Sequence, residues 1–211
     1  MEKLDYKTAR GMLIFSAQAI IDAKELLTEV DSKIGDGDHG IGMHGGMTKA
    51  KAKLESMENG DNVYDLFSEM GKSMLMSMGG ASGVIFGSMF MGGAKGTSPV
   101  SEITPMEFAE FMQRSLDTIK ARGKAEVGDK TMVDALEPAI VAMKQNAGNF
   151  ETMLAAAEKA ADEGVENTKK YQAKFGRSKS LMERAIGFQD AGATSVWIIF
   201  RAMHNFILNS I

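Results

Sequence analysis

Three aspartates fall within eight residues early in the chain, in the segment Asp31-Ser-Lys-Ile-Gly-Asp36-Gly-Asp38. Like charges this close repel one another unless a cation lies among them. Carboxylate oxygens suit hard cations, and Mg²⁺ held by few carboxylates completes its shell with water and phosphate oxygens. Gly35 and Gly37 leave the backbone free to turn the carboxylates inward. The segment is therefore a candidate magnesium site.

The same spacing is open to other interpretations. An acidic turn whose carboxylates cap neighbouring helices would have similar residues. The segment also resembles part of a calcium-binding loop, but the glycine and closing glutamate of that loop do not follow. His39 and Gly40 begin the next expected helix, whose N-terminus would attract anions. The spacing alone does not decide between the metal site and the capped turn.

Most of the 23 glycines lie between Gly35 and Gly96, which indicates a specific demand on the backbone there. In residues 79–83, Gly-Gly-Ala-Ser-Gly would let backbone N–H groups approach a ligand closely. The helix that follows carries three more glycines, each at a cost of about 1 kcal/mol relative to alanine. Tight packing of helices through small residues is the alternative explanation of this glycine-rich stretch.

Three later segments could meet a phosphate group. Residues 123–131 resemble a P-loop with one residue inserted, but no hydrophobic strand precedes them, so we reject that motif. The stretch remains a lysine-bearing loop that leads into a helix. Arg177 could donate two hydrogen bonds to a phosphate, and Asp190 could bind a ligand hydroxyl. A surface salt bridge and a helix N-cap are the simpler explanations of these two residues.

The composition limits the classes of protein. A chain of 211 residues predicts a single domain, 1–211, and the absence of cysteine excludes disulfides and thiolate sites. A net charge of -4 disfavours a general nucleic-acid binder. The N-terminus lacks the pattern of a signal peptide, and no run approaches about 18 apolar residues. We expect a cytoplasmic protein with no membrane segment.

Helical periodicity dominates the chain and predicts an all-α fold of about eight helices with no convincing strand. Short connections between them predict antiparallel neighbours. Asp61 is the expected N-cap of the third helix, and Thr104-Pro-Met-Glu107 has the pattern of a capping box. The expected helices cover about 5–30, 41–57, 62–78, 80–93, 105–122, 131–146, 150–168 and 191–208, with a further short helix before the last.

Five segments, in the same order and over nearly the whole chain, resemble the L subunit of the dihydroxyacetone kinases. They are IGDGDHG at 34–40, GGASG at 79–83, RGKAEVGDKTMVDAL at 122–136, GRS at 176–178 and ERAIGFQDAGATS at 183–195. The resemblance implies a closed barrel of eight antiparallel helices with a nucleotide, ADP or ATP, and two Mg²⁺ ions at one end.

Carried over by position, the resemblance implies that Asp31, Asp36 and Asp38 hold the metal and serve as the catalytic residues. It also implies a set of nucleotide-contacting residues: His39, Gly40, Ile41, Gly42, Ala81, Ser82, Gly123, Lys130, Thr131, Met132, Arg177, Asp190, Ala191 and Gly192. The chain departs from the family pattern at Gly42, His44, Phe188 and Ala191, which leaves the substrate open among small ketoses and tetroses.

In the resembled family, the L subunit transfers phosphate to dihydroxyacetone held on a separate K subunit, and a phosphocarrier M-type subunit of the phosphotransferase system restores the bound nucleotide. The resemblance implies these partners, with ADP retained as cofactor; a homodimer is a further expectation. Two alternatives stay open. One is a ketose or tetrose kinase with exchangeable nucleotide, and the other is a non-catalytic module that binds a lipid or a regulator.

Overall fold

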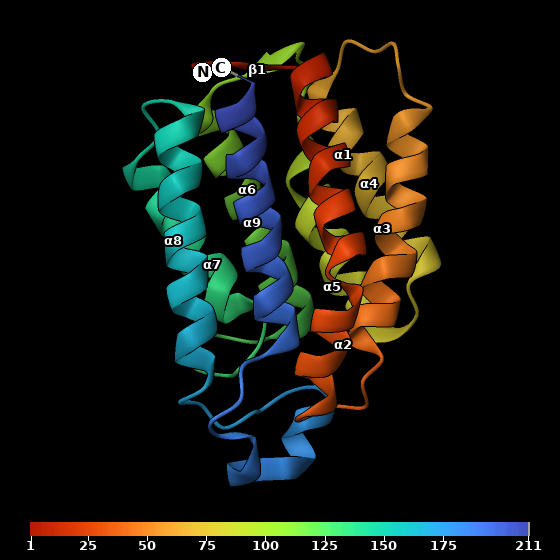
Figure 1. The fold of residues 1–211 in the computed structure, drawn as a ribbon. Coiled ribbons are helices and arrows are strands. Elements are labelled where there is room, and N and C mark those ends of the chain that lie inside the picture. The colour runs from red at the N-terminus through yellow and green to blue at the C-terminus, as the bar shows by residue number, and fades with distance from the viewer. Residues whose placement is uncertain (211) are drawn as a thin grey trace.

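The computed structural model describes residues 1–210, which form a bundle of helices (Figure 1). The α-helices are α1 (Tyr6–Asp22), α2 (Lys24–Ser32), α3 (His39–Glu55), α4 (Val63–Ser77), α5 (Gly80–Met91), α6 (Pro105–Gly123), α7 (Val133–Gln145), α8 (Phe150–Thr168) and α9 (Ala191–Asn209). Two 3-10 segments are η1 (Gly92–Ala94) and η2 (Arg177–Ala185). Strand β1 (Leu4–Asp5) pairs antiparallel with β2 (Glu102–Ile103).

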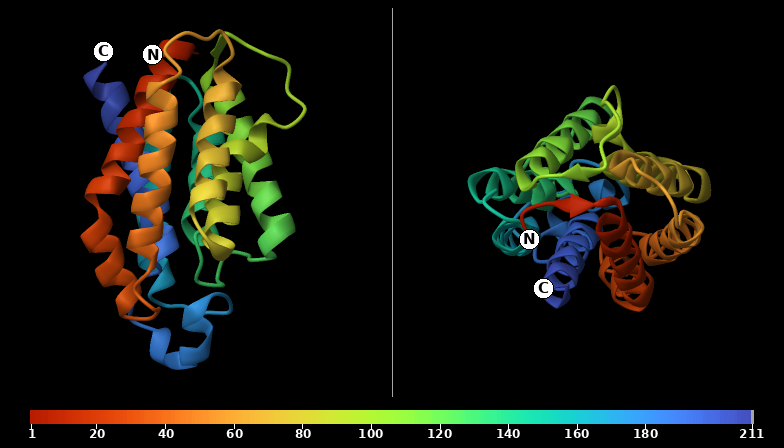
Figure 2. Two further views of the ribbon diagram at one scale, coloured as in Figure 1. Left: turned by 90° about the vertical axis from the view of Figure 1, so that its right-hand side faces the viewer. Right: turned by 90° about the horizontal axis from the view of Figure 1, so that it is seen from above.

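The long helices pack as a ring. Contacts between neighbours run from α1 through α3, α4, α5, α6, α7 and α8 to α9, and α9 packs against α1. Seen from above, these helices surround a common axis (Figure 2). The short helix α2 packs against α3 and α9 at one end. The predicted all-α bundle of antiparallel helices is confirmed in the part of the chain that the structure describes.

Because the long helices alternate in direction, the two ends of the bundle carry different parts of the chain. Helices α3, α5, α7 and α9 all begin at the end where α2 lies, whereas the two termini lie together at the opposite end (Figure 1). The segment 169–190, called the strap below, includes η2 and crosses the end of the bundle where α2 lies (Figures 1 and 2). The connections 33–38, 78–80 and 124–132 reach the same end.

The interior of the ring is filled by methionine and aromatic side chains. Phe67, Phe108 and Phe111 are fully buried in mutual contact, with ring centroids 4.8 to 6.3 Å apart. Most of the 18 methionines are also buried, where their flexible side chains fill the space between helices. No helix within residues 1–210 is both long enough and apolar enough to cross a membrane.

Gly87 of α5 and Gly93 of η1 serve close packing of helices, which was the alternative explanation of this glycine-rich stretch. A Cβ on Gly87 would lie 2.9 Å from the carbonyl oxygen of Gly71 in α4, and one on Gly93 would lie 2.2 Å from that of Phe111 in α6. These distances are shorter than van der Waals contact, so the helices approach this closely because the Cβ is missing.

Three predictions about the elements were wrong in detail. The helix expected over 5–30 breaks at Ala23, whose φ of −84° and ψ of 7° turn the chain so that α2 packs on α3 and α9. The N-cap of α4 is Asn62, which accepts from the Tyr64 amide, and not Asp61. The short β1 and β2 were not foreseen, since two-residue strands carry no periodicity. The capping box of Thr104 and Glu107 is confirmed.

Substitution of Gly71 tests the close packing of α4 on α5. A Cβ there would lie 2.5 Å from the carbonyl oxygen of Gly87 and 2.7 Å from the Cβ of Met91. We expect Gly71→Ala to lower the free energy of unfolding by about 1–3 kcal/mol because the helices must separate. Urea unfolding monitored by circular dichroism measures this change.

The matched control is Gly45→Ala in α3, where a new Cβ meets no atom within 4 Å. Alanine should stabilise that exposed helical position by up to about 1 kcal/mol through helix propensity. Equal effects of the two substitutions would contradict close α4–α5 packing.

Candidate functional site

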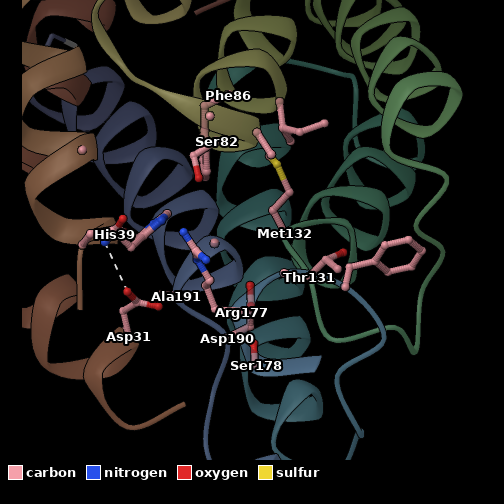
Figure 3. Close-up of a pocket in the computed structure, with 18 of the residues that line it drawn as sticks. Asp31, His39, Ser82, Phe86, Thr131, Met132, Arg177, Ser178, Asp190 and Ala191 are labelled. Carbon is pink, nitrogen blue, oxygen red and sulfur yellow. Dashed lines mark hydrogen bonds between the residues drawn. The ribbon is translucent and has the colours of Figure 1, made fainter. Parts of the chain in front are cut away.

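A cavity of about 900 Å³ opens at the end of the bundle that carries the strap (Figure 3). Its walls come from the end of α2, the strap, the starts of α3, α5 and α9, the connections that precede α3 and α5, and the loop that leads to the N-cap of α7. The lining residues are Asp31, Asp36, Asp38, His39, Ile41, Gly42, Met78, Gly79, Gly80, Ala81, Ser82, Ile85, Phe86, Lys130, Thr131, Met132, Phe175, Gly176, Arg177, Ser178, Asp190, Ala191 and Gly192.

The helix N-termini at the two ends of the bundle are capped differently. At the far end, the N-cap side chains Asp5, Asn62, Thr104 and Asn149 each accept a backbone N–H of α1, α4, α6 or α8. At the cavity, the N-cap residues of α3, α5 and α7 make no such hydrogen bond to any described residue. Helix N-termini carry partial positive charge, so the cavity is suited to an anion.

The start of α5 is the most open of these N-termini. The N–H groups of Gly80, Ala81 and Ser82 have no hydrogen-bond partner within residues 1–210. Gly80 has a φ of 65°, and a Cβ at either Gly79 or Gly80 would meet no atom within 4 Å. These two glycines therefore leave room at the cavity, unlike Gly87 later in α5, which packs against α4.

The three predicted metal ligands meet at the cavity. One carboxylate oxygen each of Asp31, Asp36 and Asp38 lies within 4.8 Å of the others. Burial raises the pKa of the Asp38 carboxyl, and repulsion by Asp36 and Asp31 adds to this effect. Because a divalent cation would relieve that repulsion, and because all the donors are hard oxygens, the cluster fits Mg²⁺.

Arg177 of the strap faces the same cluster. Its Nε lies 2.8 Å from Oδ2 of Asp36, while the Arg177 side chain remains 78% exposed. The guanidinium lowers the pKa of Asp38 and so offsets part of the repulsion. The surface salt bridge considered for Arg177 is present, and it joins the strap to a predicted metal ligand.

His39 connects the carboxylates to the last helix. Its backbone N–H donates to Oδ2 of Asp31 at 3.2 Å (Figure 3), and its Nε2 lies 2.8 Å from Oγ of Ser195. Burial lowers the pKa of the His39 imidazole to about 4, although the charge of Asp31 opposes this shift. The imidazole is therefore neutral near pH 7.

Carboxylates also shape the loop between α6 and α7. Asp134 accepts hydrogen bonds from the amides of Gly128 and Thr131, at 2.5 and 2.6 Å. Asp129 accepts from Nζ of Lys174 at 2.6 Å, which ties the loop to the strap. Helix α6, and not a strand, leads directly into this loop, so its structure agrees with the rejection of the P-loop.

Lys130 lies in this loop with a φ of 60° and a side chain only 1% exposed. Its amine donates to the carbonyl oxygens of Thr168 and Phe188, at the end of α8 and in the strap. Burial lowers the pKa of Lys130, while Asp190 and Asp134 oppose the shift. The residue lines the cavity, but its charged group is bound to the protein's own backbone.

Asp190 is the N-cap of α9 and accepts from the Ala193 amide at 2.7 Å. Burial raises the pKa of its carboxyl to about 7, against the effect of that hydrogen bond. The N-cap considered for Asp190 is thus present, and the residue also lines the cavity.

All but two of the predicted site residues line the cavity. Gly40 instead packs on α2, where a Cβ would lie 2.2 Å from Oγ1 of Thr28. Gly123 ends α6, and a Cβ there would lie 3.3 Å from Ile85.

The apolar part of the cavity wall was missed, namely Met78, Ile85, Phe86 and Phe175. Helical spacing could have indicated two of these residues. Ile85 and Phe86 each lie four positions after a predicted site residue, Ala81 or Ser82, and so on the same face of α5.

The titration of Asp190 predicts a pH dependence of stability. Between about pH 4 and about pH 7 the folded protein holds a proton on Asp190 that the unfolded chain releases, so the contribution of Asp190 to the free energy of unfolding falls as the pH rises. Asp190→Asn should remove this fall, since an amide still caps α9 but does not titrate. Urea unfolding of the ligand-free proteins from about pH 4.5 to about pH 7.5 measures the difference.

The control is Asp5→Asn at the N-cap of α1. Hydrogen bonds from Thr8 hold the pKa of the Asp5 carboxyl below its usual range, so its contribution is lost only at more acidic pH. Over the measured range its effect should be a constant offset. A constant offset for Asp190→Asn as well would contradict the raised pKa.

Comparisons with known proteins give the family of this chain and agree with its fold. The profile of the DAK2 domain family matches residues 33–205. The PEP-dependent dihydroxyacetone kinase, ADP-binding subunit DhaL, of Escherichia coli strain K12 is 36% identical over 193 residues, which is 90% of this chain and 89% of the relative. The D-erythrulose kinase of Mycolicibacterium smegmatis is 31% identical over 89% of this chain, which spans only 33% of that longer protein.

Solved structures give the same result. The dihydroxyacetone kinase of C. freundii in its native form matches with a TM-score of 0.74 and 27% identity, over 93% of this chain and 34% of that one. Its complex with AMP-PNP and Mg²⁺ matches with a TM-score of 0.72 and 26% identity, over 93% of this chain and 33% of that one. On the extent of the profile match and the identity to DhaL, this chain belongs to the DAK2 domain family.

Proposed function

We propose that this chain is the nucleotide-carrying subunit of a dihydroxyacetone-kinase-type phosphotransferase. It would transfer phosphate from Mg-bound ATP to dihydroxyacetone or a related small ketose. The observation that carries this proposal is the meeting of three carboxylates with the N-termini of four described helices at one cavity. Carboxylates bind cations and helix N-termini bind anions, and a magnesium nucleotide contains both a cation and an anion.

Charge supports a count of two magnesium ions. A nucleoside triphosphate brings about four negative charges, and the three aspartates bring three more. Two Mg²⁺ ions return about four positive charges, which makes them obligatory partners of the nucleotide in this cavity. Asp31, Asp36 and Asp38 would hold these ions, which would supply positive charge against the charge that develops during transfer.

The protein's own groups would complete the binding of the nucleotide. The unpaired N–H groups of Ala81 and Ser82 can donate to phosphate oxygens as fixed dipoles. Arg177 is exposed enough to pair with phosphate once a cation replaces it at Asp36. Met78 and Phe86 give the cavity an apolar surface that suits a base. We assign no general base in this chain.

We infer the partner subunits and the phosphate acceptor from the names of similar proteins. The proposal places the ketose on a sugar-binding K subunit and assigns rephosphorylation of retained ADP to a phosphocarrier M-type subunit, because relatives are named PEP-dependent and PTS-dependent ADP-binding subunits. Two erythrulose kinases among the relatives keep a tetrose open as the acceptor. A homodimer and a cytoplasmic location stay predictions.

The retained nucleotide distinguishes this proposal from a kinase that exchanges ADP freely. Prolonged dialysis of the ADP complex in magnesium buffer should leave most of the ADP bound. Loss of the ADP within the time of buffer exchange would favour direct use of free ATP. The carboxylates of the cavity disfavour the lipid-binding form of the other alternative, the non-catalytic module.

Asp36→Asn should remove magnesium-dependent nucleotide binding, because an amide carries no charge to hold the cation. We expect the affinity for ADP in Mg²⁺ to fall by at least about 100-fold. Substitution of a residue that only hydrogen-bonds to a metal ligand lowers affinity less, by about 10- to 100-fold. Isothermal titration of ADP, with Mg²⁺ and with a chelator, measures the change.

The control is Asp162→Asn on the exposed surface of α8, which should bind ADP as the unmodified protein does. Unchanged affinity of the Asp36→Asn protein would overturn the assignment of the metal ligands.

A further inference from the structure

Ser195 is a buried serine whose hydroxyl bonds to another helix. Ser16, which is also fully buried, donates to the carbonyl oxygen four residues earlier in its own helix, at 2.8 Å. Oγ of Ser195 instead lies 2.8 Å from Nε2 of His39, a residue 156 positions away in sequence. A hydroxyl that crosses between helices in this way can fix their relative position.

His39 is held from three directions. Its backbone amide donates to Asp31 at the end of α2, its ring pairs with Ser195 of α9, and the ring centroid lies 5.7 Å from that of Phe86 in α5. Its neighbour Asp38 belongs to the carboxylate cluster. His39 therefore connects the carboxylate cluster, through its backbone amide, to α9, through its ring. The N-terminus of α9 also lines the cavity.

We infer that Ser195 is a positioning residue that, through His39, fixes the carboxylate cluster relative to the N-terminus of α9. The role rests on the proposed magnesium-nucleotide site. Metal ligands must be held to within a fraction of an ångström, so a group that orients them affects metal affinity about 10- to 100-fold. Ser195 itself does not line the cavity, so the effect passes through His39.

The first test compares two buried serines. Ser195→Ala should weaken ADP binding in Mg²⁺ by about 10-fold. Ser16→Ala removes an equally buried hydroxyl from α1, away from the cavity, and should leave the affinity unchanged. Titration of both proteins with ADP at fixed Mg²⁺ gives the comparison. Equal affinities of the two variants would overturn the inference.

A double-mutant cycle shows whether Ser195 acts through His39. His39→Phe keeps a ring beside Phe86 and removes the nitrogen that pairs with the hydroxyl. In this background Ser195→Ala should cause no further loss of affinity, because the interaction is already absent. A further loss as large as in the unmodified protein would show that Ser195 acts independently of His39 and would overturn the proposed role.

Hydrogen exchange of the ligand-free protein separates this inference from the proposed function. Amides of residues 36–42 should exchange faster in Ser195→Ala than in Ser16→Ala, since this segment of the carboxylate cluster loses its connection to α9. Unchanged exchange in that segment would overturn the positioning role even if the protein binds ADP. Failure of the unmodified protein to bind ADP with Mg²⁺ would instead overturn the proposed function.

Discussion

The direction of the helices is the constraint on which the site depends. In an antiparallel ring every second helix begins at the same end, so α3, α5, α7 and α9 bring four N-termini together within the described chain. Each N-terminus carries partial positive charge. The side-chain caps of α1, α4, α6 and α8 stand at the opposite end. At the cavity, the N-cap side chain of α9, Asp190, accepts one N–H, whereas the start of α5 keeps N–H groups without a partner in the described chain. The fold thus prepares one end for an anion before any ligand arrives.

The positive charge of these helix N-termini explains how three carboxylates can lie at a cavity that is suited to an anion. Asp31, Asp36 and Asp38 would repel a nucleotide on their own, and burial and mutual repulsion already raise the pKa of Asp38. A divalent cation resolves both problems, since it binds carboxylates on one side and phosphate oxygens on the other. Arg177 offsets part of the same charge, and it enters from the strap that crosses the cavity. Cluster, strap and helix N-termini therefore act as one electrostatic unit.

The sequence predicted elements with strong local signals and missed those decided by tertiary contacts. The helix 150–168 and the capping box at Thr104 were confirmed, because periodicity and capping are local. The break at Ala23 depends on how α2 packs, and no residue type marks it. Most of the predicted site residues line one cavity, but the direction of the Lys130 amine toward backbone carbonyls and the pairing of Ser195 with His39 arise only when distant segments meet.

The nucleotide content of the purified protein tests the account most directly. The protein would be denatured, the released nucleotide quantified by chromatography, and magnesium measured in the same sample. The account predicts close to one ADP per chain, with magnesium present alongside it. A protein that contains no nucleotide and also fails to bind ADP with added Mg²⁺ would contradict it, and would mean that Gly42, Phe188 and Ala191 belong to a domain that has lost nucleotide binding.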